Sequence, residues 1–386
     1  MARARAFGLS APILIAGGGI WGLTLAALLK RRGRDCLVLE RAPRFAPVGA
    51  GIVIQPNATR ALRIGGIEEA VLGRGSAMQR MQIRDYRGRV LSSVEASSFA
   101  AAFSAGVVGF HRATLHAALL DLVDPSSLRL DAAVRSCGET AAGVFVELEN
   151  GERVEGSALV GADGLRSVVR RLIVKDGQPV YSGYTSWRGV TDRGSLWPAG
   201  QMSESWGEGA RFGLVAIDGN RLYWFATANV PQGGEDRSRA DLLARFGGWH
   251  EPIREVIEST PEDAILRTDI SDRDPIGRWS EGRLTLLGDA AHAMTPNLGQ
   301  GGCQAIEDAV VLDLCLSATE DCAAAFKDYE SRRLARTARV VREARRFGRI
   351  GQLENGAARA LRNLAVRMTP LSATLRTLRW LYDFDV

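Results

Sequence analysis

Three glycines near the start of the chain have the spacing that binds a pyrophosphate. Gly17, Gly19 and Gly22 follow one another as G-x-G-x-x-G, directly after the apolar run 12–16. In such a turn the first glycine allows a tight bend, the second lets backbone approach the phosphates, and the third lets a helix pack against a strand. Glu40 lies 23 residues after Gly17, where an acid accepts hydrogen bonds from a ribose. Together these residues predict a dinucleotide site.

Two later acids, Asp163 and Asp289, each follow an apolar run and a glycine. One dinucleotide fingerprint needs only the first acid, Glu40. A further acid at Asp289 suits FAD, because the ribityl chain of FAD carries additional hydroxyls that need acceptors. The glycine-rich loop 296–302 then leads into a helix N-terminus. Its positive dipole end can stabilise the negative charge of a reduced flavin.

The elements that must position these residues alternate between strand and helix. A helix is expected at residues 23–32, directly after the glycine turn, and another from Cys303 to about Leu316. The pattern predicts an α/β fold, with a Rossmann-like sheet that places the glycine turns at the carboxyl ends of its strands. The runs with the composition of buried strands are 12–16, 35–39, 158–160 and 284–287.

A second, antiparallel sheet is expected between residues 181 and 268, where Trp, Tyr and Phe recur with strand-like spacing. One helix around 241–257 interrupts it. A hairpin at Arg87-Gly88 adds two strands, and residues 128–159 are expected to form a meander with turns at Gly138, Gly143 and Asn150-Gly151. The expected boundaries are 1–72, 106–178 and 269–330 for the FAD-binding domain, 73–105 and 179–268 for an inserted substrate-binding sheet domain, and 331–386 for C-terminal helices.

The bulk composition is that of a globular protein, with 46% hydrophobic and 24% charged residues. Five cysteines without a C-x-x-C pair favour a reducing compartment. Arg3 and Arg5 precede an uncharged stretch, 10–29, which has the look of a signal anchor. The glycine turn in its middle and Pro12 at its start favour a buried strand and helix instead. We therefore expect a cytoplasmic protein.

Three ordered motifs together resemble those of the FAD-dependent aromatic monooxygenases, the p-hydroxybenzoate hydroxylase-like family. Besides the first glycine turn, residues 161–170 look like the D-G motif of that family and residues 288–296 look like its G-D motif. The likeness spans nearly the whole chain. Residues 294–301 and 349–354 look most like quinolone-ring hydroxylases, whereas FAD-dependent urate hydroxylases share residues 299–303. The cofactor motifs therefore leave the substrate open.

The resemblance implies a role for each matching residue. Val134 would touch the adenine region through its backbone, and Asp163 would lie near the pyrophosphate and also serve NAD(P)H binding. Arg211 and Tyr223 fall where some relatives place catalytic, substrate-facing residues. The implied cofactor-binding set is Gly17, Gly19, Gly22, Glu40, Arg41, Gly49, Arg112, Val134, Asp163, Asp289, Pro296, Leu298, Gly299, Gln300, Gly301 and Gly302.

The resemblance also implies the reaction. NADPH or NADH would reduce FAD, dioxygen would add at flavin C4a, and the hydroperoxide would transfer one oxygen atom to an electron-rich aromatic or heteroaromatic ring. A lipophilic quinolone is one candidate, and urate, a phenol or an epoxidation are alternatives. Two other classes remain open, a flavin reductase that inserts no oxygen and a non-enzymatic binder of lipid groups. No metal ion is expected.

Several residues near these motifs also have purely structural interpretations. Asp163 can cap the helix that follows it. His292 is favoured as a helix-start histidine bonded by backbone over a catalytic base, and Cys303 as a packing residue over a nucleophile. Trp187 and Trp224 are favoured as core residues over partners of the flavin ring.

The end of the chain is strongly basic. Residues 327–386 hold 14 Lys and Arg against 6 Asp and Glu. A solvated helix face accounts for them. Leucines interspersed with arginines from Leu361 to Leu381 offer a second interpretation, a weak peripheral contact with anionic membrane lipid. No nucleic-acid partner is expected, because the sequence contains no recognition fold, and the predicted partner is a small aromatic substrate.

Overall fold

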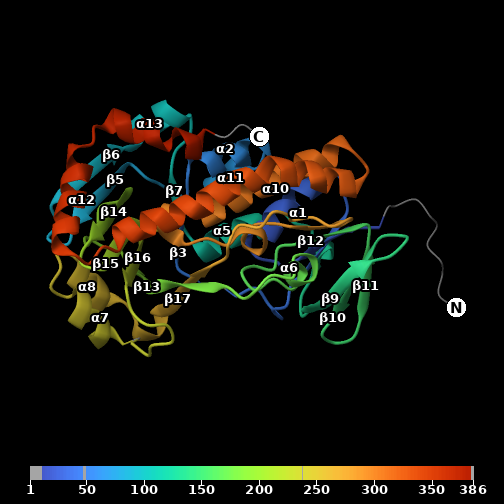
Figure 1. Cartoon of the computed structure of the whole chain (residues 1–386), viewed down its shortest axis with the longest axis horizontal. Helices are drawn as coiled ribbons and strands as arrows, with labels where there is room; N and C mark the ends of the chain where they lie inside the picture. The colour runs from blue at the N-terminus through green and yellow to red at the C-terminus, as the bar shows by residue number, and fades with distance from the viewer. Residues whose placement is uncertain (1–10, 47–48, 237, 384–386) are drawn as a thin grey trace.

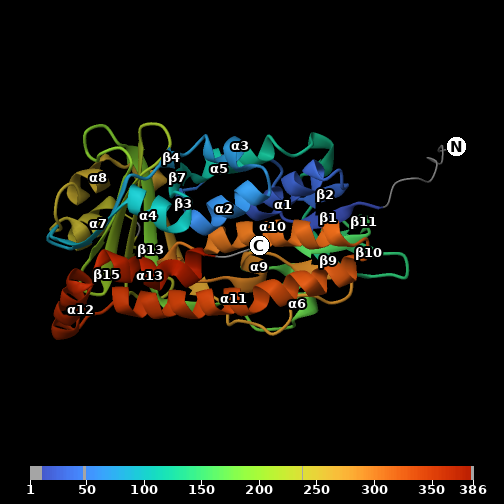
Figure 2. The ribbon, with the colours of Figure 1, turned by 90° about the horizontal axis from the view of Figure 1, so that it is seen from above.

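The computed structural model describes residues 11–46, 49–236 and 238–383. Arg3, Arg5 and Ser10 of the candidate signal anchor, and residues 47 and 48 of the loop around Gly49, lie outside this part. The molecule is elongated, with a parallel sheet towards one end and a large antiparallel sheet at the other (Figure 1). Two long helices, α10 (Gly301–Ala318) and α11 (Cys322–Gly351), run along its length (Figure 2). The predicted fold class is confirmed.

The parallel sheet contains the four predicted strands and one more. Its two central strands, Ile13–Ala16 and Ala158–Gly161, are fully buried apolar runs, which is typical of strands covered on both faces. Their core includes residues of α1 (Ile20–Arg31), α10 and a neighbouring three-stranded sheet. The strand order is β18 (Leu284–Leu286), β12 (Ala158–Gly161), β1 (Ile13–Ala16), β2 (Cys36–Leu39) and β8 (Leu128–Arg129).

The neighbouring sheet is the meander of β9 (Val134–Glu139), β10 (Val144–Leu148) and β11 (Arg153–Gly156). Gly138, predicted as a turn, lies inside β9 opposite Phe145. A Cβ at Gly138 would stand 2.9 Å from the Phe145 ring, so the glycine makes room for a cross-strand aromatic side chain. The turn between β9 and β10 spans residues 140–143, at the predicted Gly143, whose N–H donates to Thr140 Oγ1 at 3.1 Å.

The large sheet forms as predicted and is antiparallel except where β14 (Gln201–Trp206) pairs with β5 (Arg80–Asp85) in parallel. Both faces of its strand β16 (Arg221–Ala228) pack against other parts of the protein. Leu222 and Trp224 join the core under α7 and α8, while Tyr223 and Phe225 point to the opposite face. Trp187 also lies in the first of these cores, so both tryptophans are core residues as expected. The strand order is β17 (Leu266–Asp272), β13 (Val180–Asp192), β16 (Arg221–Ala228), β15 (Ala210–Ala216), β14 (Gln201–Trp206), β5 (Arg80–Asp85) and β6 (Val90–Glu95).

Two helices, rather than the single predicted one, cross this sheet. They are α7 (Arg239–Phe246) and α8 (Ile253–Ser259). Ser238 and Asp241 form a reciprocal capping box at the start of α7, and Gly247 caps its end. Pro252, the N-cap of α8, separates the two. The sequence pattern merged them because both bury the same apolar periodicity against one face of the sheet.

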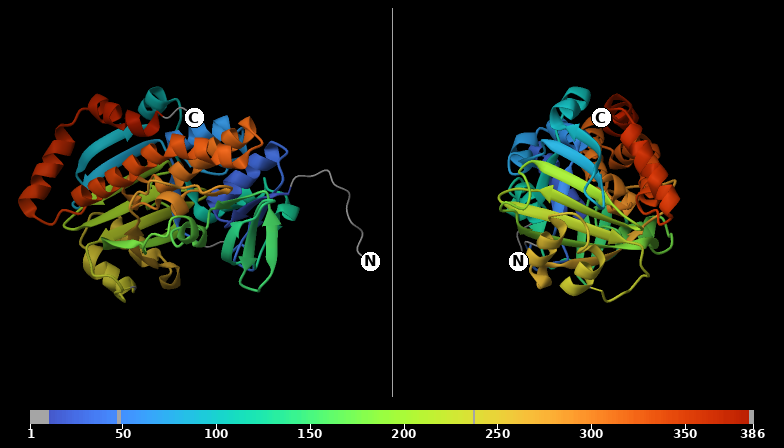
Figure 3. Two further views of the ribbon diagram at one scale, coloured as in Figure 1. Left: turned by 45° about the vertical axis from the view of Figure 1, so that its right-hand side comes forward. Right: turned by 90° about the vertical axis from the view of Figure 1, so that its left-hand side faces the viewer.

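The remaining elements are helices, turns and a further three-stranded sheet, of order β3 (Gly51–Ile54), β7 (Val108–His111) and β4 (Ser76–Ala77). The C-terminal helices α12 (Gly356–Met368) and α13 (Leu371–Tyr382) bend round the end of the molecule that holds the large sheet (Figure 3). No helix among the described residues is long and apolar enough to span a bilayer. The other elements are β3 (Gly51–Ile54), β4 (Ser76–Ala77), β7 (Val108–His111), α2 (Pro56–Ile64), α3 (Glu68–Leu72), α4 (Ala96–Phe103), α5 (Arg112–Leu120), α6 (Val168–Ile173), α9 (Asp289–His292) and the 3-10 turns Pro125–Ser127, Glu262–Ala264 and Pro296–Leu298.

Candidate functional site

The glycine turn lies between β1 and α1, at the carboxyl end of the strand. A Cβ on Gly17 would stand 2.5 Å from the carbonyl oxygen of Ala162, and one on Gly22 would stand 2.0 Å from that of Gly17. Both glycines are therefore required by close backbone contacts. A Cβ on Gly19 would meet no atom within 4 Å. The turn thus leaves open space at the one glycine that is predicted to face the pyrophosphate.

The start of α1 can bind an anion. Gly19 is its N-cap and offers no side chain to the first N–H groups, and the first turn contains no acid. Glu40 is held beside this turn, because its Oε2 accepts from the Gly18 N–H at 2.7 Å and its Oε1 from the Ala42 N–H at 2.9 Å. The carboxylate therefore stands where the sequence predicts a ribose acceptor.

Asp163 caps helix α6, in agreement with the structural interpretation of this residue. Its Oδ2 accepts from the Val168 N–H at 2.7 Å and more weakly from the Val169 N–H at 3.4 Å. Its Oδ1 is buried and has no hydrogen-bond partner among the described residues. Burial raises the pKa of this carboxyl. One oxygen thus serves the fold, and the other remains available to a ligand.

The G-D turn places Asp289 at the first residue of α9. Burial raises the pKa of Asp289, and the nearby charge of Arg112 opposes that shift. Next to it, His292 bonds the Asp308 carboxylate at 2.5 Å, rather than backbone as expected. Asp308 also accepts from the Gly288 N–H at 3.1 Å and from Arg333 Nε at 2.7 Å. His292 and Asp308 therefore fix the turn that presents Asp289.

The loop 296–302 ends at the N-terminus of α10. This helix begins at Gly301, two residues before the predicted start at Cys303, because Gln300 is already its N-cap. The cap makes no side-chain hydrogen bond and the first turn holds no acid, so the positive end of the helix dipole stays uncompensated. Gly299 adopts φ of 62°, a conformation that favours glycine.

The sequence reasoning missed Gln55, which holds this loop. Its Nε2 donates to the Leu298 carbonyl at 2.9 Å, and its Oε1 accepts from Gln300 Nε2 at 2.8 Å. The same Oε1 also accepts from Tyr382 Oη at 2.8 Å, at the end of α13. A signal was present in the sequence, since a glutamine precedes the helix that starts at Pro56, but its partners are more than 240 residues away.

Arg211 lies at the centre of a buried polar cluster on the large sheet. Its side chain is only 2% exposed. It donates from Nε to Gln352 Oε1 at 2.8 Å, from Nη1 to Glu204 Oε1 at 3.0 Å and from Nη2 to Asn297 Oδ1 at 2.5 Å. These partners come from α11's C-cap, β14 and the 296–302 loop.

Asn297 is the second residue that the sequence reasoning missed. It belongs to the glycine-rich loop 296–302, and its Oδ1 accepts from both Arg211 and Tyr184 Oη, the latter at 3.2 Å. A cavity of about 540 Å³ opens beside this cluster, within the usual size range of small-molecule sites. Asn297, Tyr184 and Gln352 are among the residues that line it.

Tyr223 lies on the same face of the sheet as Arg211 but at a distance from it. Arg211 pairs with Thr227, and Val215 pairs with Tyr223, so four residues separate them along each strand. A Cβ on Gly51 would stand 2.2 Å from the Tyr223 ring, which therefore packs directly on strand β3. Burial raises the pKa of its hydroxyl. The hydroxyl has no hydrogen-bond partner among the described residues.

The other predicted cofactor residues lie around the carboxyl edge of the parallel sheet. Arg41 is exposed directly after Glu40, and Val134 begins β9 in a half-buried position. Gly49 has φ of 133°, and a Cβ there would stand 2.9 Å from Cδ of Arg112. Their contacts with a cofactor remain predictions.

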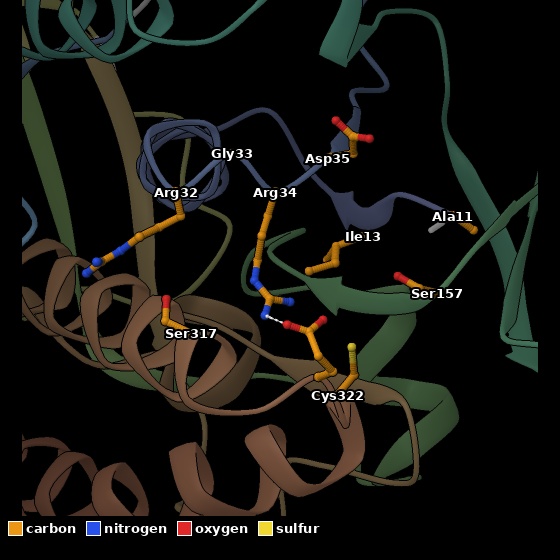
Figure 4. Close-up of a pocket in the computed structure, with 10 residues that line it drawn as sticks. Ala11, Ile13, Arg32, Gly33, Arg34, Asp35, Ser157, Ser317 and Cys322 are labelled. Carbon is orange, nitrogen blue, oxygen red and sulfur yellow. Dashed lines mark hydrogen bonds and ion pairs between the residues drawn. The ribbon is translucent and has the colours of Figure 1, made fainter. Parts of the chain in front are cut away.

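Cys303 is fully buried in α10, and burial raises the pKa of its thiol to about 12. This supports the packing role over that of a nucleophile. A second polar cavity, also of about 540 Å³, lies at the opposite edge of the parallel sheet, where Arg34 pairs with Glu320 at 2.8 Å (Figure 4). It is remote from the glycine turn, because its lining residues Ile13, Asp35 and Ser157 precede or start their strands.

Several features together fit an FAD molecule. They are the open space at Gly19, the uncapped N-termini of α1 and α10, the unpartnered Oδ1 of Asp163 and the buried carboxyl of Asp289. Two helix N-termini suit an extended group with negative charge at two places. The fold and this site define a flavin-binding α/β protein.

The chain belongs to the FAD binding domain family, whose model matches residues 10–344. It is 48% identical over 358 residues to aurachin C monooxygenase/isomerase of Stigmatella aurantiaca, covering 92% of this chain and 94% of the relative. It is 35% identical over 339 residues to the FAD-dependent urate hydroxylase of Klebsiella pneumoniae, covering 86% and 88%. The structure of Klebsiella pneumoniae HpxO complexed with FAD and uric acid matches with a TM-score of 0.90 at 31% identity, covering 96% and 97%.

These matches establish the predicted class. The chain is an FAD-dependent monooxygenase, an oxidoreductase that uses O2 and NAD(P)H. The reductase and lipid-binder alternatives are not favoured. The salicylate hydroxylase substrate complex, at 21% identity and a TM-score of 0.80, shares the fold.

Proposed function

We propose that this monooxygenase hydroxylates an apolar aromatic or heteroaromatic ring, of which a lipophilic quinolone is the first candidate, with NADPH or NADH as electron donor. When bound, FAD supplies the redox chemistry and the activated oxygen. The residues of the chain hold the flavin, orient the ring and exclude water. The 48% identity to a monooxygenase named for aurachin C supports the assignment.

The observation that carries this proposal is the hydrogen bond between Arg211 and Asn297, 2.5 Å long. Asn297 belongs to the loop that ends at the positive N-terminus of α10, and Arg211 belongs to the large sheet. The reactive end of the cofactor and a ring lying on the sheet would therefore meet here. The adjacent cavity gives a small molecule access to Asn297 and Gln352, both partners of Arg211.

Arg211 and Tyr223 have different tasks in this proposal. The two terminal nitrogens of Arg211 carry two N–H groups each, and the bonds to Glu204 and Asn297 use one on each. The others can hydrogen-bond a ring oxygen and stabilise negative charge on it, which makes the ring a better nucleophile. Tyr223 supplies a flat apolar surface against β3 and a free hydroxyl.

An apolar ring is favoured by the surroundings of Tyr223. Met81, Met202 and Phe225 of the sheet and Leu375, Leu378 and Trp380 of α13 belong to the hydrophobic cluster that contains it. Burial of an apolar ring among such side chains contributes about 25 cal/mol per Å². Urate or a phenol is the second candidate, favoured by the likeness to the HpxO structure with uric acid.

The test uses purified protein with its flavin. Oxidation of NADPH and of NADH is followed in air with hydroxyquinolones, urate and simple phenols, and product mass is read in the same tubes. We expect hydroxyquinolones to accelerate oxidation and to yield a product heavier by one oxygen atom. Such a product from urate alone would move the assignment to the second candidate. Hydrogen peroxide as the sole product with every compound would contradict both.

We further propose that the protein works in the cytoplasm and makes weak peripheral contact with membranes through its basic C-terminal helices. All five cysteines are unpaired thiols, which suits a reducing compartment.

A further inference from the structure

Helix α12 buries an arginine and exposes its large apolar side chains. Its one buried residue is Arg362, whereas Leu361, Leu364 and Met368 are 69%, 52% and 72% exposed. Leu371, the first residue of α13, is 39% exposed and follows Met368 after the short connection Thr369-Pro370. Residues spaced by three or four share one face of a helix. We call the four apolar side chains the leucine face.

The inward position of Arg362 is specific. Its Nη1 donates to the carbonyl oxygens of Ile350 and Gly351, both at 3.1 Å, and its guanidinium lies 4.8 Å from the centre of the Trp206 ring. These contacts cap the end of α11 and fix the rotation of α12. The leucine face therefore points outward because Arg362 points inward. Contiguous exposed apolar side chains of this kind mark an interaction surface.

The positive charge around the leucine face indicates which kind of partner it binds. Residues 355–382 contain Arg359, Arg362, Arg367, Arg376 and Arg379 and no Asp or Glu. Arg367, Arg376 and Arg379 are exposed. A second copy of the chain, paired through the same surface about a two-fold axis, would bring these arginines towards their own equivalents. A bilayer with anionic headgroups accepts leucines among its acyl chains and arginines among its phosphates.

We propose that the leucine face and the arginines beside it form a docking surface for an anionic lipid bilayer, through which the enzyme takes a lipid-dissolved substrate. The first half deepens the membrane contact proposed above by naming its surface and its lipid, and the second half rests on the proposed hydroxylation. The same helices carry both parts, since the inner face of α13 contributes Leu375, Leu378 and Trp380 to the cluster around Tyr223. Helices α12 and α13 run along the end of the molecule that holds the large sheet (Figures 1 and 3), and α13 packs on the hydrophobic cluster that contains Tyr223.

Co-sedimentation with vesicles tests the docking surface. We expect the full-length flavoprotein to pellet with vesicles of phosphatidylcholine and phosphatidylglycerol, to pellet far less with phosphatidylcholine alone, and to be released by high salt. The affinity of Leu361→Gln/Met368→Gln for these vesicles should fall at least about tenfold. The affinity of Arg367→Gln/Arg376→Gln should fall by a similar factor. Glutamine preserves helix propensity, so α12 should still form.

Matched variants control for general effects of lost apolar or basic surface. Ile64→Gln/Leu172→Gln removes exposed apolar side chains from α2 and α6, and Arg135→Gln/Arg153→Gln removes exposed arginines from the three-stranded sheet. Both should pellet as the wild type does. Equal pelleting of all variants would overturn the proposal. So would a wild-type dimer in sedimentation velocity that Leu361→Gln/Met368→Gln makes monomeric.

The activity readout separates this inference from the proposed function. With a water-soluble hydroxyquinoline in buffer, the leucine-face variant should hydroxylate at the wild-type rate. With a long-chain quinolone supplied in anionic vesicles, its rate should fall about tenfold or more, in step with vesicle binding. A rate that stays at the wild-type level there would refute delivery from lipid. Wild-type vesicle binding without any hydroxylated product would instead reject the proposed hydroxylation and support the docking surface.

Discussion

The two ends of the molecule hold their predicted ligands with different parts of the chain. At the parallel sheet the cofactor site is made largely of backbone, with glycines at positions 17, 19 and 22 and the open N-termini of α1 and α10. At the large sheet the proposed ring site is made of side chains. Arg211, Asn297 and Gln352 reach it from a strand, a loop and the end of a helix.

This difference decides how each end responds to substitution. Close contacts with backbone atoms cannot relax by rotating a side chain, so a substitution there has its full cost in stability and cofactor binding. A network of side chains loses its bonds one at a time, because each partner can re-solvate or find another donor. We therefore expect nearly all-or-none effects at the cofactor end and graded effects at the ring end.

The largest expected effect is that of Gly22→Ala. The new Cβ would stand 2.0 Å from the Gly17 carbonyl oxygen, a backbone atom in a turn that is itself pinned against Ala162. We expect a loss of about 3 kcal/mol or more in the free energy of unfolding, together with loss of bound FAD. Urea unfolding and the flavin absorbance of the purified protein measure both.

Gly19→Ala is the matched control. Its Cβ would meet no protein atom within 4 Å, so the flavin-free protein should lose no more than about 1 kcal/mol, the cost of Ala in place of Gly at the N-cap of α1. FAD affinity should still fall at least about tenfold, because the pyrophosphate is expected to approach at that position. A Gly19→Ala protein that binds FAD normally would contradict the prediction that the pyrophosphate lies in the open space at Gly19.

The cofactor end could be predicted from the sequence because its signals are local. Gly17 and Gly22 meet within one turn, and Glu40 returns by a single strand and helix, so spacing alone defines the geometry. The ring end could not be predicted to the same depth. Asn297 and Gln352 lie 86 and 141 residues from Arg211, and Gln55 lies still further from its partner Leu298. The hydrophobic periodicity of the sequence does not predict such long-range contacts, because they depend on how the sheet, the loop and α11 pack together.

Arg211→Gln tests whether the ring end can lose its function while the cofactor end stays intact. FAD should stay bound, because Arg211 touches the side chains of Glu204, Asn297 and Gln352 and none of the glycine turn. The yield of hydroxylated product per NAD(P)H oxidised should fall about tenfold or more, as a ring oxygen loses its positioning cation. Product and peroxide are measured in the same reaction.

Arg267→Gln controls for the loss of a buried arginine in the same sheet. Arg267 is also nearly buried and paired, with Asp236 at 2.9 Å and Asp269 at 2.8 Å, but it does not contact the Arg211 cluster. Both variants should lose about 1–3 kcal/mol in stability. Only Arg211→Gln should lower the product yield; equal yields would mean that Arg211 acts through the fold.

Gln55→Leu tests the link between the two ends and should have an intermediate effect. It removes the donor to Leu298 and the acceptor for Gln300 and Tyr382. We expect about 1–2 kcal/mol of destabilisation and a shift of the flavin reduction potential, because the loop at the N-terminus of α10 loses its anchor. Tyr382→Phe removes one of these bonds and should shift the potential less. An unchanged potential in Gln55→Leu would show that the loop holds its position alone.

The smallest effect at neutral pH is expected for Cys303→Ala. Burial raises the pKa of this thiol to about 12, so it is neutral and unreactive at working pH. We expect product formation within about twofold of the wild type and a loss of about 1 kcal/mol in the free energy of unfolding. Appreciable alkylation of Cys303 in the folded protein at neutral pH would contradict this packing role.

The pH dependence of Cys303→Ala gives the comparison a sharper test. An unfolded thiol titrates near 8.5, below the folded value, so the stability gained from keeping Cys303 neutral is present below that pH and is lost as the pH rises. Above about pH 9 the wild type should lose up to about 1.4 kcal/mol per pH unit more than Cys303→Ala. Urea unfolding of both proteins on either side of pH 9 measures the difference. Parallel pH curves would mean that the thiol can ionise within the fold, and that α10 is less closed around Cys303 than its burial shows.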